Sequence, residues 1–261
     1  MKGGTILKSF LVHPLTKGLN LDTPELTYLR RQIIQKKKFL HRVYEAWYRS
    51  LIISIPEGNG AVLEIGAGAG FFKKILPDII TSECFYLFNI DLVLDASHLP
   101  FADGSLKAIA MTDVFHHLPK PRLFLLEALR CLRPGGIIVM VEPWVTSWSR
   151  FVYSKFHHEP FQPNAKQWEF KSTGPLSGAN GALPWIVFCR DRKQFESEFP
   201  QLHIHSIEPM MPFSYLLSGG VSLISLQPQW TFGFWRFLES LLARWMDNCA
   251  MFSKIVLVKI D

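Results

Sequence analysis

The sequence predicts an α/β fold whose central sheet is doubly wound and mostly parallel, with an antiparallel strand at the C-terminus. Over residues 61–141, short apolar runs alternate with amphipathic helical segments through short connections, the pattern of a parallel sheet covered on both faces. Glycines at 66, 68 and 70 follow the first apolar run directly. Such a glycine loop permits the sharp strand-to-helix turn of a Rossmann-like sheet.

Apolar periodicity and turn residues place the remaining elements. Residues 22–55 carry apolar side chains about every 3.6 positions after a capping Asp-Thr-Pro-Glu start, which predicts a helical N-terminal cap. Further helices are expected at 71–76, 121–132, 191–199 and about 234–248, and strands at 61–65, 79–83, 90–95, 107–113, 137–141, 203–208 and 255–260.

Two segments break this rhythm and are interpreted as aromatic-rich insertions, at about 144–184 and 209–250. The second contains no charged residue from Pro209 to Trp235. An uncharged aromatic stretch of this kind is typical of a cover over a pocket, and it also suits a surface that touches lipid.

Composition and charge exclude several classes of protein. The 261 residues are 48% hydrophobic and 19% charged, which excludes intrinsic disorder. The four cysteines are scattered without a CxxC pair, which argues against a disulfide framework or a structural zinc site. The net charge of the chain is +6, and residues 1–50 alone carry +7, with 10 Lys and Arg against 3 Asp and Glu. A nucleic-acid-binding protein is therefore not expected.

The glycine loop is preceded inside its strand by an acidic residue, Glu64. The spacing of the glycines is G-x-G-x-G. Phe71 occupies the position of the third glycine in the dinucleotide-binding fingerprint G-x-G-x-x-G. A carboxylate in this crevice would repel a pyrophosphate. It suits a ligand that carries a sulfonium and an ammonium group.

Three ordered motifs carry a resemblance to a known family. AVLEIGAGAG, DASHLPFADGSLKAIAMTDVFHHLP and LRCLRPGGIIVMVEPW are similar to the successive motifs of class I S-adenosylmethionine-dependent methyltransferases, and most similar to those of the type-11 group, which modifies small molecules. The resemblance implies S-adenosyl-L-methionine as cofactor. It divides the chain into an N-terminal cap over 1–58 and a methyltransferase domain over 59–261.

The resemblance also implies roles for individual residues at the strand ends. The loop would hold the methionine part of the cofactor, and an acid at the end of the second strand would bind the ribose. Glu83 ends the predicted second strand, whereas Asp91 has the more usual spacing; we favour Glu83 because Asp91 begins the next strand. The expected cofactor-binding residues are Glu64, Gly66, Ala67, Gly68, Gly70, Glu83, Asp95, Ala96, Asp113 and Val114.

Methyl transfer to an oxygen or nitrogen needs alignment of the two groups, and a base where the nucleophile is protonated. Four residues are candidates for this role: His116, His117, Glu142 and His157. Each has a structural alternative, such as a turn contact for His117 or an ion pair with Arg150 for Glu142. No metal is expected, because the spacing of the histidines fits no recognised ligand set.

Tryptophans concentrate in the cap and the insertions, which predicts a hydrophobic or aromatic small molecule, or a lipid-linked intermediate, as the methyl acceptor. A nucleic-acid or protein substrate lacks support, because no N/D-P-P-Y motif follows the fourth strand. A non-catalytic methyltransferase-like subunit of a complex stays open as the alternative. The expected location is cytoplasmic, and peripheral membrane contact and a homodimer are left open.

Overall fold

The computed structural model describes residues 23–156, 159–172, 174 and 178–261, and its seven described strands form one sheet in the order β3-β2-β1-β4-β5-β7-β6. The strands are β1 (Ala61–Ile65), β2 (Ile80–Glu83), β3 (Leu92–Val93), β4 (Leu106–Thr112), β5 (Leu132–Pro143), β6 (Leu202–Met210) and β7 (Phe252–Lys259). Pairing is parallel from β3 to β5, and β7 pairs antiparallel with both β5 and β6. This confirms the predicted Rossmann-like sheet with an antiparallel C-terminal strand.

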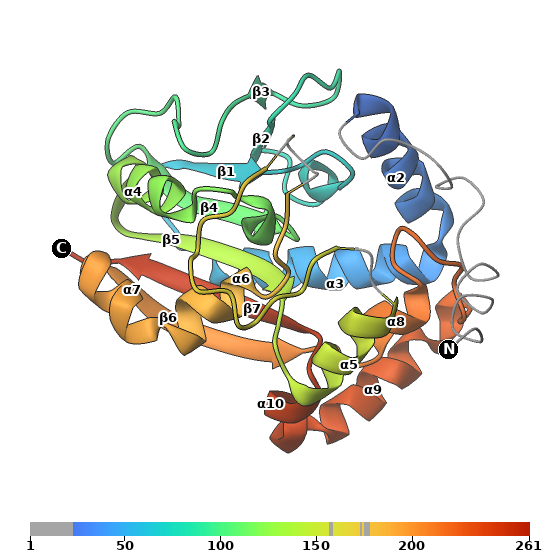
Figure 1. Ribbon diagram of the computed structural model, residues 1–261. Coiled ribbons are helices and arrows are strands. Elements are labelled where there is room, and N and C mark those ends of the chain that lie inside the picture. Colours follow the sequence, from blue (N-terminus) through green and yellow to red (C-terminus); the bar gives the residue numbers. More distant parts are fainter. Residues whose placement is uncertain (1–22, 157–158, 173, 175–177) are drawn as a thin grey trace.

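Helices cover both faces of the sheet (Figure 1). One face is covered by α4 (Pro121–Cys131), α6 (Leu183–Trp185), the π-helical turn η4 (Ile186–Arg190) and α7 (Arg192–Glu198). The opposite face is covered mainly by α3 (Lys38–Ser54), with contributions from α5 (Ser147–Phe156). The N-terminal helices therefore form part of the packed core.

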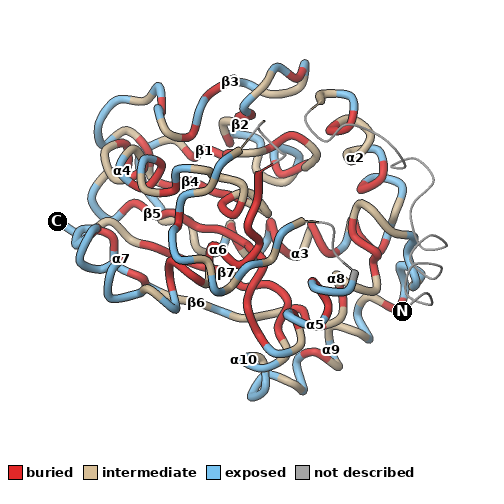
Figure 2. Tube along the Cα trace, viewed as in Figure 1, coloured by how far each residue is buried: buried red, intermediate tan, exposed pale blue. Residues whose placement is uncertain are grey.

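Alternation along the strands separates the two cores. In β4, Ile109 and Met111 point into the core under α4, whereas Ala108 and Ala110 point toward α3. The small alanine side chains leave room for the buried aromatic side chains of α3, because successive strand residues face opposite sides of the sheet. Figure 2 shows the resulting band of buried residues along the central strands.

The helix predicted over 22–55 is divided in two, α2 (Pro24–Lys36) and α3, at Lys37. Lys37 has a non-helical backbone with φ −80° and ψ 87°, and its ammonium group donates hydrogen bonds to the carbonyls of Gly220 and Leu223. Burial lowers the pKa of Lys37 to about 8. The break therefore lets Lys37 contact a segment 183 to 186 residues later in the chain. Helical periodicity in the sequence cannot predict such a contact.

The region after the glycine loop is shorter than expected. A 3-10 turn, η2 (Phe72–Lys74), stands where a helix was predicted, and β3 keeps only two residues of the predicted strand 90–95. Asp91 lies just before this short strand. Its carboxylate accepts hydrogen bonds from the amide and hydroxyl of Thr81, each at 2.8 Å, and joins the start of β3 to β2 through a side chain.

The uncharged stretch and its flank fold into short helices. These are α8 (Ser214–Ser218), η5 (Gln229–Thr231), α9 (Phe232–Leu241), η6 (Ala243–Trp245) and α10 (Met246–Cys249). The single helix predicted over 234–248 is thus divided by 3-10 geometry. Within the described residues, none of the helices has the length and apolar character needed to cross a bilayer.

Trp47 of α3 contacts both β7 and α8 and provides a test of the packing. Its buried ring lies 4.8 Å from the ring of Phe252 on β7 and 5.5 Å from that of Tyr215 on α8, and its indole nitrogen contacts Met211 Sδ at 3.1 Å. We expect Trp47→Ala to lower the free energy of unfolding by about 3–5 kcal/mol in chemical denaturation.

Ile53, on the same helix but exposed, supplies the matched control for this prediction. Ile53→Ala should change the free energy of unfolding by less than about 0.5 kcal/mol. Equal effects of the two substitutions would contradict the packing of α3 on the sheet.

Candidate active site

A cavity of about 740 Å³ opens at the carboxyl ends of the parallel strands. It lies beside the junction of β1 and β4, where the strand order reverses, the usual ligand position in open α/β sheets. Eight residues expected to bind cofactor line it: Glu64, Gly66, Gly70, Glu83, Asp95, Ala96, Asp113 and Val114. The other two, Ala67 and Gly68, lie in the same loop and are tied to β2 by bonds from Ala67 N to Ser82 O (2.9 Å) and from Gly68 N to Glu83 Oε2 (3.0 Å).

The glycine loop is closely packed. Gly66 has φ +73°, and a Cβ at this position would lie 2.4 Å from Val114 Cγ2. A Cβ on Gly68 would lie 2.7 Å from both Glu83 Oε2 and Thr27 Cγ2. Side chains at these positions would displace the residues that shape the cavity wall.

Glu64 and Glu83 place two buried carboxyl groups at the ends of adjacent strands. Burial, together with the charge of Glu83, raises the pKa of Glu64 to about 8, and the charge of Arg31 opposes this shift. Two neighbouring acids in a buried wall favour a ligand with positive charge, because such a ligand stabilises their ionised forms.

The structure distinguishes the two acids considered for the second strand. The Glu83 carboxylate lies at the cavity and accepts the amides of Gly68 and Cys84 at 3.0 and 3.1 Å. Asp91 pairs with Lys73 and with Thr81 instead, and it is not among the residues that line the cavity.

Asp113 follows β4 with φ +62°, a conformation that costs a non-glycine residue about 1–3 kcal/mol. The turn directs it into the cavity. Burial raises the pKa of Asp113 to about 7, while the nearby His116 opposes that rise and the carboxylate of Glu159 adds to it. A strained, partly buried acid with a raised pKa at the carboxyl edge is typical of a functional position.

The turn η3 (Phe115–His117) after Asp113 is held by Glu142, at the end of β5. The fully buried Glu142 carboxylate accepts the amides of Val114 and Phe115 at 2.8 and 2.7 Å. Its other oxygen lies 2.7 Å from His116 Nδ1. Glu142 therefore fixes the position of both the turn and the His116 ring.

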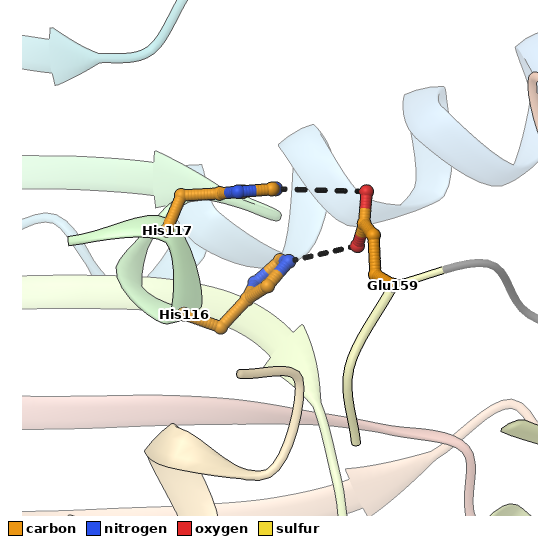
Figure 3. A group of neighbouring side chains, drawn as sticks. All are labelled: His116, His117 and Glu159. Atoms are coloured by element: carbon orange, nitrogen blue, oxygen red, sulfur yellow. Dashed lines mark ion pairs between the residues drawn. The ribbon is translucent and has the colours of Figure 1, made fainter. Parts of the chain in front are cut away.

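Glu159 meets both histidines from the opposite side (Figure 3). Its oxygens lie 3.5 Å from His116 Nε2 and 3.9 Å from His117 Nε2. Burial alone would lower the pKa of His116, but bonds to Glu142 and Glu159 hold it well above its ordinary value. Burial lowers the pKa of His117 to about 4, and the charge of His116 acts in the same direction.

Of the four residues predicted for catalysis, the structure places one at the cavity surface and two behind it. His117 lines the cavity, as does Glu159 beside it. His116 and Glu142 are buried behind the cavity wall, and Glu142 pairs with His116 rather than with Arg150. His157 lies outside the described residues.

Several lining residues were not predicted from the sequence. Tyr44 and Tyr48 from α3, Tyr153 from α5 and Tyr215 from α8 form an aromatic wall, and Arg30 from α2 lies beside them. The tyrosines at 44 and 48 have helical spacing, so the sequence alone indicates a buried helix face. Their contact with the cavity depends on where α3 crosses the sheet.

The Glu64 carboxyl group gives a pH-dependent prediction. A folded-state pKa near 8 means that the folded protein keeps a proton which the unfolded chain releases above about pH 4.5. Unfolding is therefore favoured as pH rises from about 4.5 to 8. Glu64→Gln removes this effect.

We expect the variant to match the wild type in thermal unfolding near pH 5 and to exceed it increasingly up to pH 8, by at most about 1.4 kcal/mol per pH unit. A stability difference that stays constant between pH 5 and pH 8 would contradict the raised pKa.

The chain is similar to known methyltransferases in sequence and in fold. Residues 63–140 match the family model described as "Methyltransferase domain", type 11. Over 147 residues, 25% are identical to 2-methyl-6-phytyl-1,4-hydroquinone methyltransferase of Synechocystis, covering 48% of this chain and 45% of that protein. Over 120 residues, 29% are identical to demethylmenaquinone methyltransferase of Beutenbergia cavernae, covering 40% and 50%. Each match spans half or less of the relative's length.

Among solved structures, the fold is similar to that of a methyltransferase from Thermotoga maritima described as a possible histamine N-methyltransferase. The TM-score is 0.52 with 16% identity, over 89% of this chain and 99% of that one. Sheet order, glycine loop, family model and structural likeness agree. Residues 63–140 therefore carry the type-11 methyltransferase domain of the class I S-adenosylmethionine-dependent methyltransferases.

Proposed function

We propose that the protein transfers a methyl group from S-adenosyl-L-methionine to an oxygen or nitrogen of a hydrophobic or aromatic small molecule or lipid-linked intermediate. The observation that carries this proposal is the composition of the cavity. One part is formed by the glycine loop and buried acids, and the other by tyrosines and the polar groups His117 and Glu159. Its volume suits two small ligands held side by side.

The first part of the cavity fits the cofactor. Gly66, Gly68 and Gly70 would hold its methionine portion beside Glu64, whose carboxylate matches the ammonium and sulfonium charges. Glu83 would accept the ribose hydroxyls, and Asp95 with Ala96 would bind the adenine edge. When bound, the cofactor supplies an electrophilic methyl group.

The second part fits the acceptor. The aromatic wall excludes water and favours a ring or an apolar chain. His117 Nδ1 lies 3.1 Å from the carbonyl of Gly178, so this nitrogen donates and Nε2 faces Glu159 as a proton acceptor. His117 Nε2 and the Glu159 carboxylate are thus placed to take a proton from a hydroxyl or ammonium nucleophile. The similarity to a 2-methyl-6-phytyl-1,4-hydroquinone methyltransferase and to a demethylmenaquinone methyltransferase supports a ring-containing acceptor.

The acceptor side is covered by residues that lead to an exposed apolar surface. Gly219 to Leu223 line the cavity, and the Lys37 ammonium group holds two of their carbonyls. Exposed Ile224 and Leu226 follow directly. Beyond them, Phe234, Phe237 and Leu241 lie on one face of α9, between exposed Trp230 and Trp245.

We propose that this surface, Ile224 to Trp245, contacts an anionic bilayer from which the acceptor enters. Trp and Phe favour the interfacial layer of a membrane. Cationic groups flank the patch: Arg244 lies 4.0 Å from the Trp245 ring centre, and Arg42 of α3 lies 5.7 Å from that of Phe232. These charges complement acidic headgroups.

The cofactor assignment is tested by calorimetric titration with S-adenosyl-L-methionine. We expect the wild type to bind, and Gly68→Val to weaken binding about 5- to 150-fold, because overpacking of the loop costs about 1–3 kcal/mol. Glu83→Gln should also weaken binding by removing a charged hydrogen-bond acceptor.

Gly233→Ala is the matched control, since a Cβ at Gly233 meets nothing within 4 Å. Absence of binding by the wild type, or equal binding by Gly68→Val and Gly233→Ala, would refute the assignment.

Membrane contact is tested by flotation with phosphatidylcholine vesicles that contain about one-third phosphatidylserine. We expect the wild type to float with the vesicles and the triple variant Trp230→Ser/Phe234→Ser/Phe237→Ser to remain in the soluble fraction. Ile53→Ser, an exposed apolar change on α3, should float like the wild type.

A wild type that stays soluble would overturn the lipid contact. So would a dimer that the triple substitution dissociates in the absence of any flotation, because the apolar face would then cover a second copy.

A further inference from the structure

We propose that a divalent transition-metal ion binds in the cavity wall between His116, His117 and Glu159. This site goes beyond the proposed function and departs from the sequence prediction that no metal is held. The two histidines are adjacent on η3, and Glu159 comes from a loop 42 residues later in the chain. Spacing alone therefore cannot indicate the set, because the fold brings it together.

The three side chains already surround one point. A ligand atom from each residue lies within 4.8 Å of the others, and the two nitrogen–oxygen separations are 3.5 and 3.9 Å. Ligand atoms at about 2.0–2.2 Å from a tetrahedral ion stand roughly 3.3–3.6 Å apart. Side-chain shifts of a few tenths of an ångström up to about 1 Å would complete this geometry. Figure 3 shows both rings directed at the Glu159 carboxylate.

The outer contacts of both histidines are those that orient metal-binding imidazoles. His116 Nδ1 is bonded to the buried Glu142 carboxylate at 2.7 Å, and His117 Nδ1 to the Gly178 carbonyl at 3.1 Å. Each bond fixes the ring and directs Nε2 toward the shared point. Histidine ligands in metal sites are held by carboxylate and carbonyl partners in the same way.

The donor set selects the class of ion. Two imidazole nitrogens and one carboxylate oxygen suit Zn²⁺, Co²⁺ or Fe²⁺ and are a poor site for Mg²⁺ or Ca²⁺, which prefer oxygen ligands. Because His117 and Glu159 line the cavity, a further coordination position would face the acceptor. A hydroxyl bound there would lose its proton more readily. This consequence alone depends on the proposed function.

The competing explanation is a metal-free ion pair, in which a protonated His116 lies between Glu142 and Glu159. The two explanations differ in what the protein retains. We would strip the full chain with a chelator, dialyse it against Zn²⁺, remove free ion and measure bound zinc by mass spectrometry. Co²⁺ titration followed by visible absorption reports the coordination geometry independently.

We expect about one zinc per chain and a tetrahedral Co²⁺ spectrum. Glu159→Gln and His117→Gln should each weaken metal binding by about 100-fold or more, because each removes a ligand, and Glu142→Gln by about 10- to 100-fold, because it removes an outer partner. His203→Gln is the matched control, since His203 is exposed on β6.

Zinc retained equally by the Glu159 and His203 variants, or not retained by the wild type, would overturn the proposal in favour of the ion pair. Circular dichroism checks folding of every variant. Calorimetry with S-adenosyl-L-methionine on the same preparations separates failure of the metal site from failure of the cofactor site.

Discussion

The buried Glu142 carboxylate is the contact on which the rest of the site depends. It lies at the end of β5 and accepts hydrogen bonds from the amides of Val114 and Phe115, which ties the turn after β4 to β5. A fully buried carboxylate is tolerated only where such bonds replace its hydration. Through this contact the strained backbone of Asp113 and the ring of His116 acquire fixed positions at the carboxyl edge of the sheet.

That edge joins two kinds of chemistry in one cavity. The strand ends supply acidic groups and backbone amides, whose arrangement follows from sheet topology. The opposite side of the cavity is lined by residues of α2, α3, α5 and α8, and the tyrosines of the last three form its aromatic wall. The basic charge of the first fifty residues precedes the glycine loop in the sequence, and part of it reaches the cavity: Arg30 lines it, and the charge of Arg31 acts on the pKa of Glu64.

Features that depend on neighbouring residues in the sequence could be predicted from it. The glycine loop, Glu64 and the acids at strand ends could be placed because parallel strands end at one edge. The break at Lys37 could not, since it depends on carbonyls at 220 and 223. The group formed by His116, His117 and Glu159 was equally hidden, because two separate segments create it. The sequence predicts a catalytic role for Glu142. Its side chain faces the turn after β4 and not the cavity, because β5 pairs with β4.

The position of the cofactor in the cavity is tested most directly by a crystal structure of the protein with S-adenosyl-L-homocysteine. We expect the amino-acid portion of this ligand beside Gly66 to Gly70, its ribose hydroxyls within hydrogen-bond distance of Glu83, and its sulfur directed toward Asp113 and His117. Electron density for the ligand elsewhere on the protein, or with its ribose held by Asp91 instead of Glu83, would contradict this expectation.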